Sequence, residues 1–169
     1  MLGYIRSGVG TVPPGGADLL LARVAATLQA EGVPLAGVVQ VNEVFDPARP
    51  CHMDLHVLTG GSVIRISQDL GALSKGCRLD PSGLEQAVGL VIQALEGGPR
   101  LLILNKFGKQ EADGRGFRPV IGQAIAAGVP VLTAVSQTNL AAFERFSEGL
   151  GEALPMDLEK ILGWCRAQI

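Results

Sequence analysis

Residues 101–117 read LLILNKFGKQEADGRGF, and this stretch decides the fold. Its first four residues, Leu101–Leu104, form a continuous apolar run, which is typical of a β-strand that is covered on both faces. The polar residues Asn105 and Lys106 follow directly, and three glycines interrupt the segment after them. The stretch therefore predicts a buried parallel strand that leads into a polar loop.

Apolar patterns of two kinds alternate along the rest of the chain. Short continuous runs predict strands, and apolar residues at spacings of three and four predict amphipathic helices. The expected strands are Leu2–Arg6, Leu35–Val41, Leu101–Leu104 and Val129–Val135. The expected helices are Ala17–Ala30, a segment between Asp80-Pro81 and Gly97, Phe117–Ala127, a segment marked by Leu140 and Phe146, and one marked by Leu158 and Cys165. This alternation predicts a three-layer α/β fold with a mainly parallel sheet.

The segment from residue 52 to about 66 departs from that pattern. Met53–Leu58 and Val63–Ile66 are two short runs on either side of Gly60-Gly61, which predicts a small β-hairpin insertion. We expect residues 1–169 to form one domain, because most domains have about 100–200 residues.

Composition excludes several classes of protein. The 14 Lys and Arg are offset by 16 Asp and Glu, and without a basic stripe we expect no binding to nucleic acid. No apolar run reaches the length of about 18 residues that a membrane helix needs, and the N-terminal MLGYIRSGVG has no apolar signal core. We therefore expect a cytoplasmic protein without a membrane partner.

Ligands of open α/β sheets bind beyond the carboxyl ends of the strands. Here those ends are residues 7–16, 40–46, 105–116 and 135–139. Between the first strand and helix, Gly10 and Gly15 have the spacing of the phosphate-binding loop G-x-x-x-x-G-K-[ST]. Gly16 and Ala17 stand in its lysine and hydroxyl positions, and two prolines remove backbone donors. Either the segment is a plain connection, or Gly10, Thr11, Gly15 and Gly16 still hold a ligand without the lysine.

The segment after Leu104 is the second candidate site. Residues 106–118 carry a net charge of +2, from four cations that include Arg118 against Glu111 and Asp113. This charge at a strand end favours an anion site formed by Asn105, Lys106, Lys109 and Arg115. The alternative is a solvated loop with internal ion pairs, in which Glu111 or Asp113 would neutralise Lys106.

Cysteines support a metal site only weakly. Cys51, His52 and Cys77 could contribute ligands, but their spacing matches no zinc pattern, so we expect no metal and treat the cysteines as buried apolar residues. Three cysteines are an odd number, which argues against a complete disulfide framework. Cys165 lies on the apolar face of the last expected helix and is assigned to the core.

Several strings together resemble an uncharacterised bacterial family whose genes are often found near molybdenum-transport genes. The strings are Gly37-Val-Val-Gln40, Cys51-His-Met-Asp-Leu55, Ile66-Ser-Gln68, Gly76-Cys-Arg-Leu-Asp80 and residues 102–117. That family in turn is similar to P-loop nucleoside-triphosphatases whose second motif reads D-E-I-G-x-M-E. The match puts Asn105 and Lys106 at the two acids and Glu111 at the last acid. The resemblance implies a P-loop NTPase-like fold with degenerate motifs.

Three functions remain open on this evidence. The first is a ligand-binding or accessory protein on a degenerate P-loop scaffold, linked to molybdenum metabolism, which binds a nucleotide (with Mg²⁺) or an oxyanion. The second is an active nucleoside-triphosphatase in which Glu111 or Asp80 replaces the lost acid. The third is a protein-interaction module, with a protein partner or a second copy of the chain.

Overall fold

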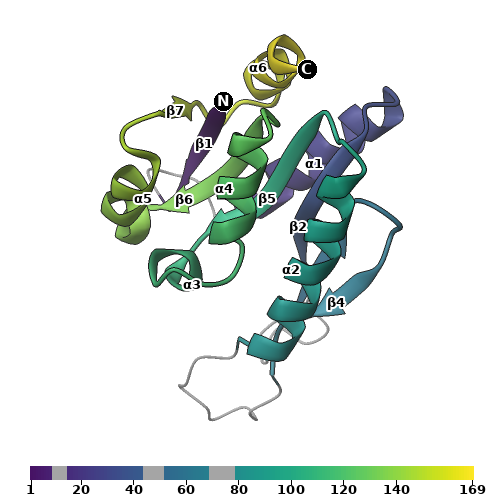
Figure 1. Ribbon diagram of the computed structural model, residues 1–169, viewed down its shortest axis with the longest axis vertical. Coiled ribbons are helices and arrows are strands. Elements are labelled where there is room, and N and C mark those ends of the chain that lie inside the picture. Colours follow the sequence, from purple (N-terminus) through teal and green to yellow (C-terminus); the bar gives the residue numbers. More distant parts are fainter. Residues whose placement is uncertain (9–14, 44–51, 69–78) are drawn as a thin grey trace.

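The structure is a computed structural model that describes residues 1–8, 15–43, 52–68 and 79–169. All seven strands of these ranges belong to one sheet in the order β4-β3-β2-β5-β6-β1-β7 (Figure 1). Five neighbouring strands are parallel: β2 (Leu35–Glu43), β5 (Leu101–Phe107), β6 (Val131–Ser136), β1 (Leu2–Ser7) and β7 (Gly151–Leu154). The expectation of an α/β fold with a mainly parallel sheet is confirmed.

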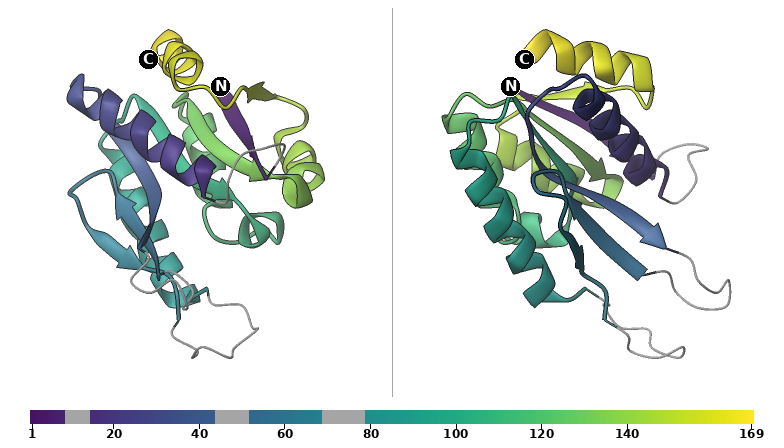
Figure 2. Two further views of the ribbon diagram at one scale, coloured as in Figure 1. Left: turned by 180° about the vertical axis from the view of Figure 1, so that it is seen from behind. Right: turned by 90° about the vertical axis from the view of Figure 1, so that its right-hand side faces the viewer.

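Helices cover both faces of the sheet, which gives three layers (Figure 2). On one face, α1 (Gly16–Ala30) and α6 (Leu158–Gln168) pack over apolar side chains such as Ile5 and Ile103. On the other face lie α2 (Pro81–Glu96), α4 (Arg118–Ala126) and α5 (Leu140–Ser147), which follows the short 3₁₀ helix Gln137–Asn139. Within the described ranges, no helix is both long and apolar enough to cross a lipid bilayer.

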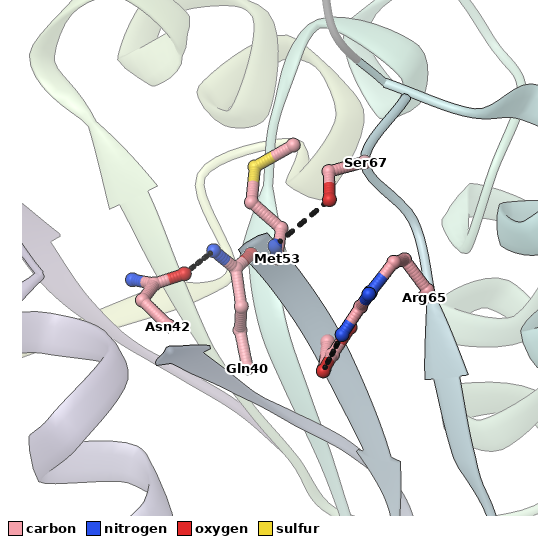
Figure 3. Close-up of polar contacts among 6 residues, drawn as sticks. Gln40, Asn42, Met53, Arg65 and Ser67 are labelled. Carbon is pink, nitrogen blue, oxygen red and sulfur yellow. Dashed lines mark hydrogen bonds and ion pairs between the residues drawn. The ribbon is translucent and has the colours of Figure 1, made fainter. Parts of the chain in front are cut away.

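The predicted hairpin is present and extends the sheet. Strands β3 (His52–Val57) and β4 (Val63–Arg65) are antiparallel to each other, and β3 is antiparallel to β2. Arg65 donates two hydrogen bonds to the buried carboxylate of Asp54, at 2.9 and 3.1 Å, across the hairpin (Figure 3). These bonds hold the pKa of Asp54 below its usual value, so the carboxylate stays charged within the sheet.

Three features differ from the sequence-based expectation. β5 runs to Phe107 instead of ending at Leu104, because buried Asn105 is hydrogen-bonded to the neighbouring strand and the chain stays extended there. The segment expected to be a polar loop contains the short helix α3 (Lys109–Ala112). The edge strand β7 was not predicted, since its four residues show no apolar alternation.

Other predictions concern the cysteines. Cys165 is fully buried, as expected, and burial raises the pKa of its thiol to about 12. Cys51 and Cys77 lie outside the described residues.

Gly37 lets β2 and β5 pair at the centre of the sheet. Its φ is 116°, and a Cβ at this position would overlap the backbone carbonyl of Ile103 on the partner strand. Only glycine combines this backbone angle with so close a contact.

We therefore predict that Gly37→Ala lowers the free energy of unfolding by about 2–4 kcal/mol, because both strain and overlap must be relieved. The matched control is Gly89→Ala, since a Cβ at Gly89 meets no atom within 4 Å. That helical substitution should stabilise the protein by about 0.5–1 kcal/mol. Chemical denaturation measures both changes, and equal stability of the two variants would contradict this role of Gly37.

Candidate functional site

Strand order brings three predicted ligand segments to one place. Because β6 lies between β5 and β1, the carboxyl ends of these parallel strands are neighbours. A cavity of about 510 Å³, here called the first cavity, opens at this edge. Its lining comes from the end of β1, the start of α1, the end of β5 and the segment after β6: Ser7, Gly8, Gly15–Asp18, Lys106–Lys109, Ser136 and Asn139.

The helix α1 presents its N-terminus to the first cavity. Gly15 precedes the helix and has no side chain with which to cap it, so among the described residues the N–H groups of the first turn have no side-chain cap. The N-terminus of a helix carries a partial positive charge and attracts anions. Of the predicted loop residues, Gly15 and Gly16 line this cavity, whereas Gly10 and Thr11 lie outside the described residues.

The cations of the first cavity come from β5 and α3. Lys106 is the second-last residue of β5 and Lys109 is the first residue of α3, and both side chains are exposed. Among the described residues, neither lysine has an ion-pair partner. Both ammonium groups are therefore available to a ligand.

The acids that could have neutralised Lys106 are engaged elsewhere. Glu111 is buried, and its carboxylate accepts hydrogen bonds from the backbone N–H groups of Gly108 at 2.9 Å and Phe117 at 3.0 Å. Asp113 pairs with Arg115 at 3.4 Å. The sequence left open whether Glu111 or Asp113 pairs with Lys106. In the structure neither does, and Asp113 pairs with Arg115 instead.

Glu111 closes the segment between β5 and α4. Its two backbone bonds join residues 108 and 117, and a Cβ on Gly116 would overlap its carboxylate, so glycine is required there. The other proposed acid, Asp80, caps α2 by accepting a hydrogen bond from the N–H of Ser82 at 3.0 Å. Both carboxylates thus have structural partners.

Asn105 belongs to a chain of side-chain hydrogen bonds that leads to the first cavity. Its amide donates to Gln40 at 2.9 Å. The amide of Gln40 donates to Asn42 at 2.6 Å, as Figure 3 shows. Asn42 then donates to the carboxylate of Asp18 at 3.3 Å. Asn105 also accepts from the backbone N–H of Gln40 at 3.2 Å. We call these four side chains the amide relay.

The hydrogen bonds of the amide relay can run in one direction only, from donor to acceptor. A carboxylate only accepts and a backbone N–H only donates, so the two ends together fix which way each of the three amides faces. Asp18 lines the first cavity, and its hydrogen bond from Asn42 engages one carboxylate oxygen. Sequence reasoning identified Asn105 but not Gln40 or Asn42, although both lie at a strand's carboxyl end, which was the available signal.

The structure brings some predicted residues together and separates others. Gly15, Gly16, Lys106 and Lys109 share the first cavity. Asn105 lines a second, smaller cavity beside it, and Arg115 lines neither. His52 is part of β3, and the described residues contain no group of three or more His, Cys, Asp or Glu side chains suited to a metal.

The chain is an α/β protein with an open, mainly parallel sheet and a cavity at the carboxyl edge of its strands. It belongs to the family described as "Protein of unknown function (DUF2478)", whose profile matches residues 9–164. The chain is also 39% identical over 149 residues to the "Molybdenum import ATP-binding protein ModC 2" of Bradyrhizobium diazoefficiens. The aligned part is 88% of this chain but 17% of that protein, so the chain spans about one sixth of its relative. No solved structure gives a significant match.

We predict that Glu111→Gln destabilises the protein by about 1–3 kcal/mol, because the new amide nitrogen cannot accept the N–H bond that a carboxylate oxygen accepted. Asp113→Asn is the control, since its partner is exposed and the loss should stay below about 0.5 kcal/mol. Thermal or chemical unfolding measures the difference. A Glu111→Gln protein as stable as the control would show that Glu111 is not the structural group we describe.

Proposed function

We propose that this protein binds an anionic small molecule, a nucleotide or an oxyanion, in the first cavity, and that it acts as a binding or accessory protein on a degenerate P-loop NTPase-like scaffold. The observation that carries the proposal is the meeting in one cavity of the α1 N-terminus, whose cap residue Gly15 has no side chain, with Lys106 and Lys109, which form no ion pair with any described residue. An anion there would gain two charged partners and the helix dipole.

The position of these lysines explains how a loop without its usual lysine could still hold phosphate or a similar group. Gly16 and Ala17 supply neither an ammonium group nor a hydroxyl. Lys106 and Lys109 line the same cavity as Gly16 but come from the β5–α3 side. In our proposal they replace, from the opposite wall, the charge that the loop lost.

Asp18 does not cancel this charge. It is one carboxylate against two ammonium groups, and it already accepts a hydrogen bond from Asn42. Its place in the first turn of α1 also lets it interact with the helix dipole. The cavity therefore keeps a positive balance on the side of the β5–α3 segment.

Cavity size is compatible with a nucleotide. A volume of about 510 Å³ falls within the range of about 300–1,000 Å³ that is usual for small-molecule sites. An oxyanion would fill only part of this space, next to the lysines, and leave room for water or a second group.

The relative from Bradyrhizobium supports the choice of first probes. Its name refers to ATP binding and to molybdenum import. Because the chain aligns with about one sixth of that protein, both properties are proposals for this chain. They nonetheless single out ATP and molybdate among nucleotides and oxyanions, and they suggest a role connected with molybdenum handling.

For the binding function, we predict that Lys106→Ala leaves the melting temperature of the free protein almost unchanged but abolishes its stabilisation by the ligand. In the wild type, a ligand at 100 times its Kd should add about 2.7 kcal/mol of stability. Lys109→Ala should weaken the effect. The control is Arg115→Ala, which removes an exposed cation outside the cavity.

Thermal shift and calorimetry with ATP, GTP, tripolyphosphate, phosphate, sulfate and molybdate measure these effects. An equal ligand response in Lys106→Ala and Arg115→Ala would remove the first cavity as the site. No response of the wild-type protein to any of these probes would favour the protein-interaction alternative.

For turnover, we predict that hydrolysis of ATP and GTP is negligible with or without Mg²⁺. Loss of one positioned transition-state contact costs about 10²–10³ in rate, and here the loop lysine, the loop hydroxyl and the strand acids are all replaced. β5 offers Asn105, whose amide is bonded to Gln40, instead of a carboxylate. Phosphate-release assays test this, and Mg²⁺-dependent turnover near 1 s⁻¹ that is lost in Lys106→Ala would support the triphosphatase alternative.

A further inference from the structure

A second cavity lies against the first one, on the side of β2 and the hairpin. Its volume is about 140 Å³, and Lys106, Gly108 and Lys109 line both cavities. Most of its remaining wall is apolar and comes from separate elements: Leu55, Ile66, Leu79, Leu84 and Phe117. The two lysines therefore stand where the two cavities meet.

The second cavity has the size of a single ring. Its volume is close to that of engineered apolar cavities of about 150 Å³, which bind benzene. Leu55, Ile66 and Phe117 are at most 4% exposed, so the side chains that form the wall are held in the core. Its charged lining residues are Lys106 and Lys109, which it shares with the first cavity, and Glu111, whose carboxylate is held by the backbone N–H groups of Gly108 and Phe117.

Two buried amides give this apolar cavity a polar edge. Gln40 and Asn105 both line it and are 4% and 3% exposed. The amide relay uses one N–H of each side-chain nitrogen, for Asn42 and for Gln40 respectively. The second N–H of each nitrogen has no partner among the described residues, so the cavity offers hydrogen-bond donors whose direction the relay fixes.

We propose that the second cavity holds the base of a nucleotide whose phosphates lie in the first cavity, and that Gln40 and Asn105 select a base with carbonyl oxygens on its edge. This inference rests on the proposed binding function and narrows its ligand from any anion to a nucleotide. Buried amide donors left without acceptors are costly, so a ring edge that supplies acceptors is favoured over one that presents an amino group.

Affinities of compounds that share the phosphates but differ in the ring test the proposal. We expect UTP, whose single ring carries two carbonyl oxygens, to bind about ten-fold or more tightly than tripolyphosphate, because it buries its ring. ATP, whose base has two rings, an amino group and no carbonyl oxygen, should bind more weakly than UTP. Isothermal titration calorimetry gives all three constants.

Variants that plug the second cavity separate it from the first. Gln110 and Leu79 are half-buried at its lining, so Gln110→Trp and Leu79→Trp should fill it without opening the core. Each should bring the affinity for UTP down to that for tripolyphosphate, which should itself be unchanged. The control is Ile125→Trp, at an exposed residue of another cavity.

The outcomes distinguish this inference from the function on which it rests. Two results would overturn the inference but leave the anion site supported. One is tight tripolyphosphate binding with no higher affinity for any nucleotide, and the other is unchanged base selectivity in both tryptophan variants. A preference for ATP over UTP would overturn the selection by the amides. Saturation-transfer NMR with free uridine probes the ring alone. Nucleoside binding without any phosphate binding would support the second cavity and overturn the anion site, and absence of both would overturn both.

Discussion

The hydrogen bonds between Asn105 and Gln40 are the contact on which the proposed site depends. They join β5 to β2 beyond the last regular pairing of these strands, where backbone bonds alone would let them separate. Buried amides must find partners, and each of these two satisfies the other. As a result β5 stays extended to Phe107, which carries Lys106 to the edge of the sheet.

The contact between Asn105 and Gln40 is connected to the walls of both cavities. Through Asn42 the relay continues to Asp18 in the first turn of α1, and so it connects the wall of the second cavity with the wall of the first. On the other side, Glu111 holds the ends of the 108–117 segment and places Lys109 beside Lys106. The amide relay and the hydrogen bonds of Glu111 thus position Lys106 and Lys109. Neither network includes a lysine ammonium group, and no described residue forms an ion pair with either lysine.

This arrangement differs from that of a triphosphatase in the source of its charges. A working enzyme of that kind needs a cation in the loop and acids at the end of the strand, as the sequence motifs state. Here β5 supplies the amide of Asn105 and the ammonium group of Lys106. The carboxylates of Glu111 and Asp80 accept hydrogen bonds from backbone N–H groups. β5 presents no carboxylate at its end that could serve as a general base for water.

The sequence by itself determined the α/β class, the helices on both faces and the hairpin, because apolar periodicity reports burial within short segments. It also predicted a ligand site at the carboxyl edge of the sheet that includes Lys106 and Lys109. Only the tertiary structure decided the roles of polar residues. Asn105 and Gln40 lie 65 positions apart, so no local pattern links them. The sequence could not show that the Glu111 carboxylate binds backbone N–H groups, or that Arg115 lies outside the cavity that Lys106 and Lys109 line. Hydrogen-bond partners of this kind come from strand order and register, which depend on contacts that no local pattern records.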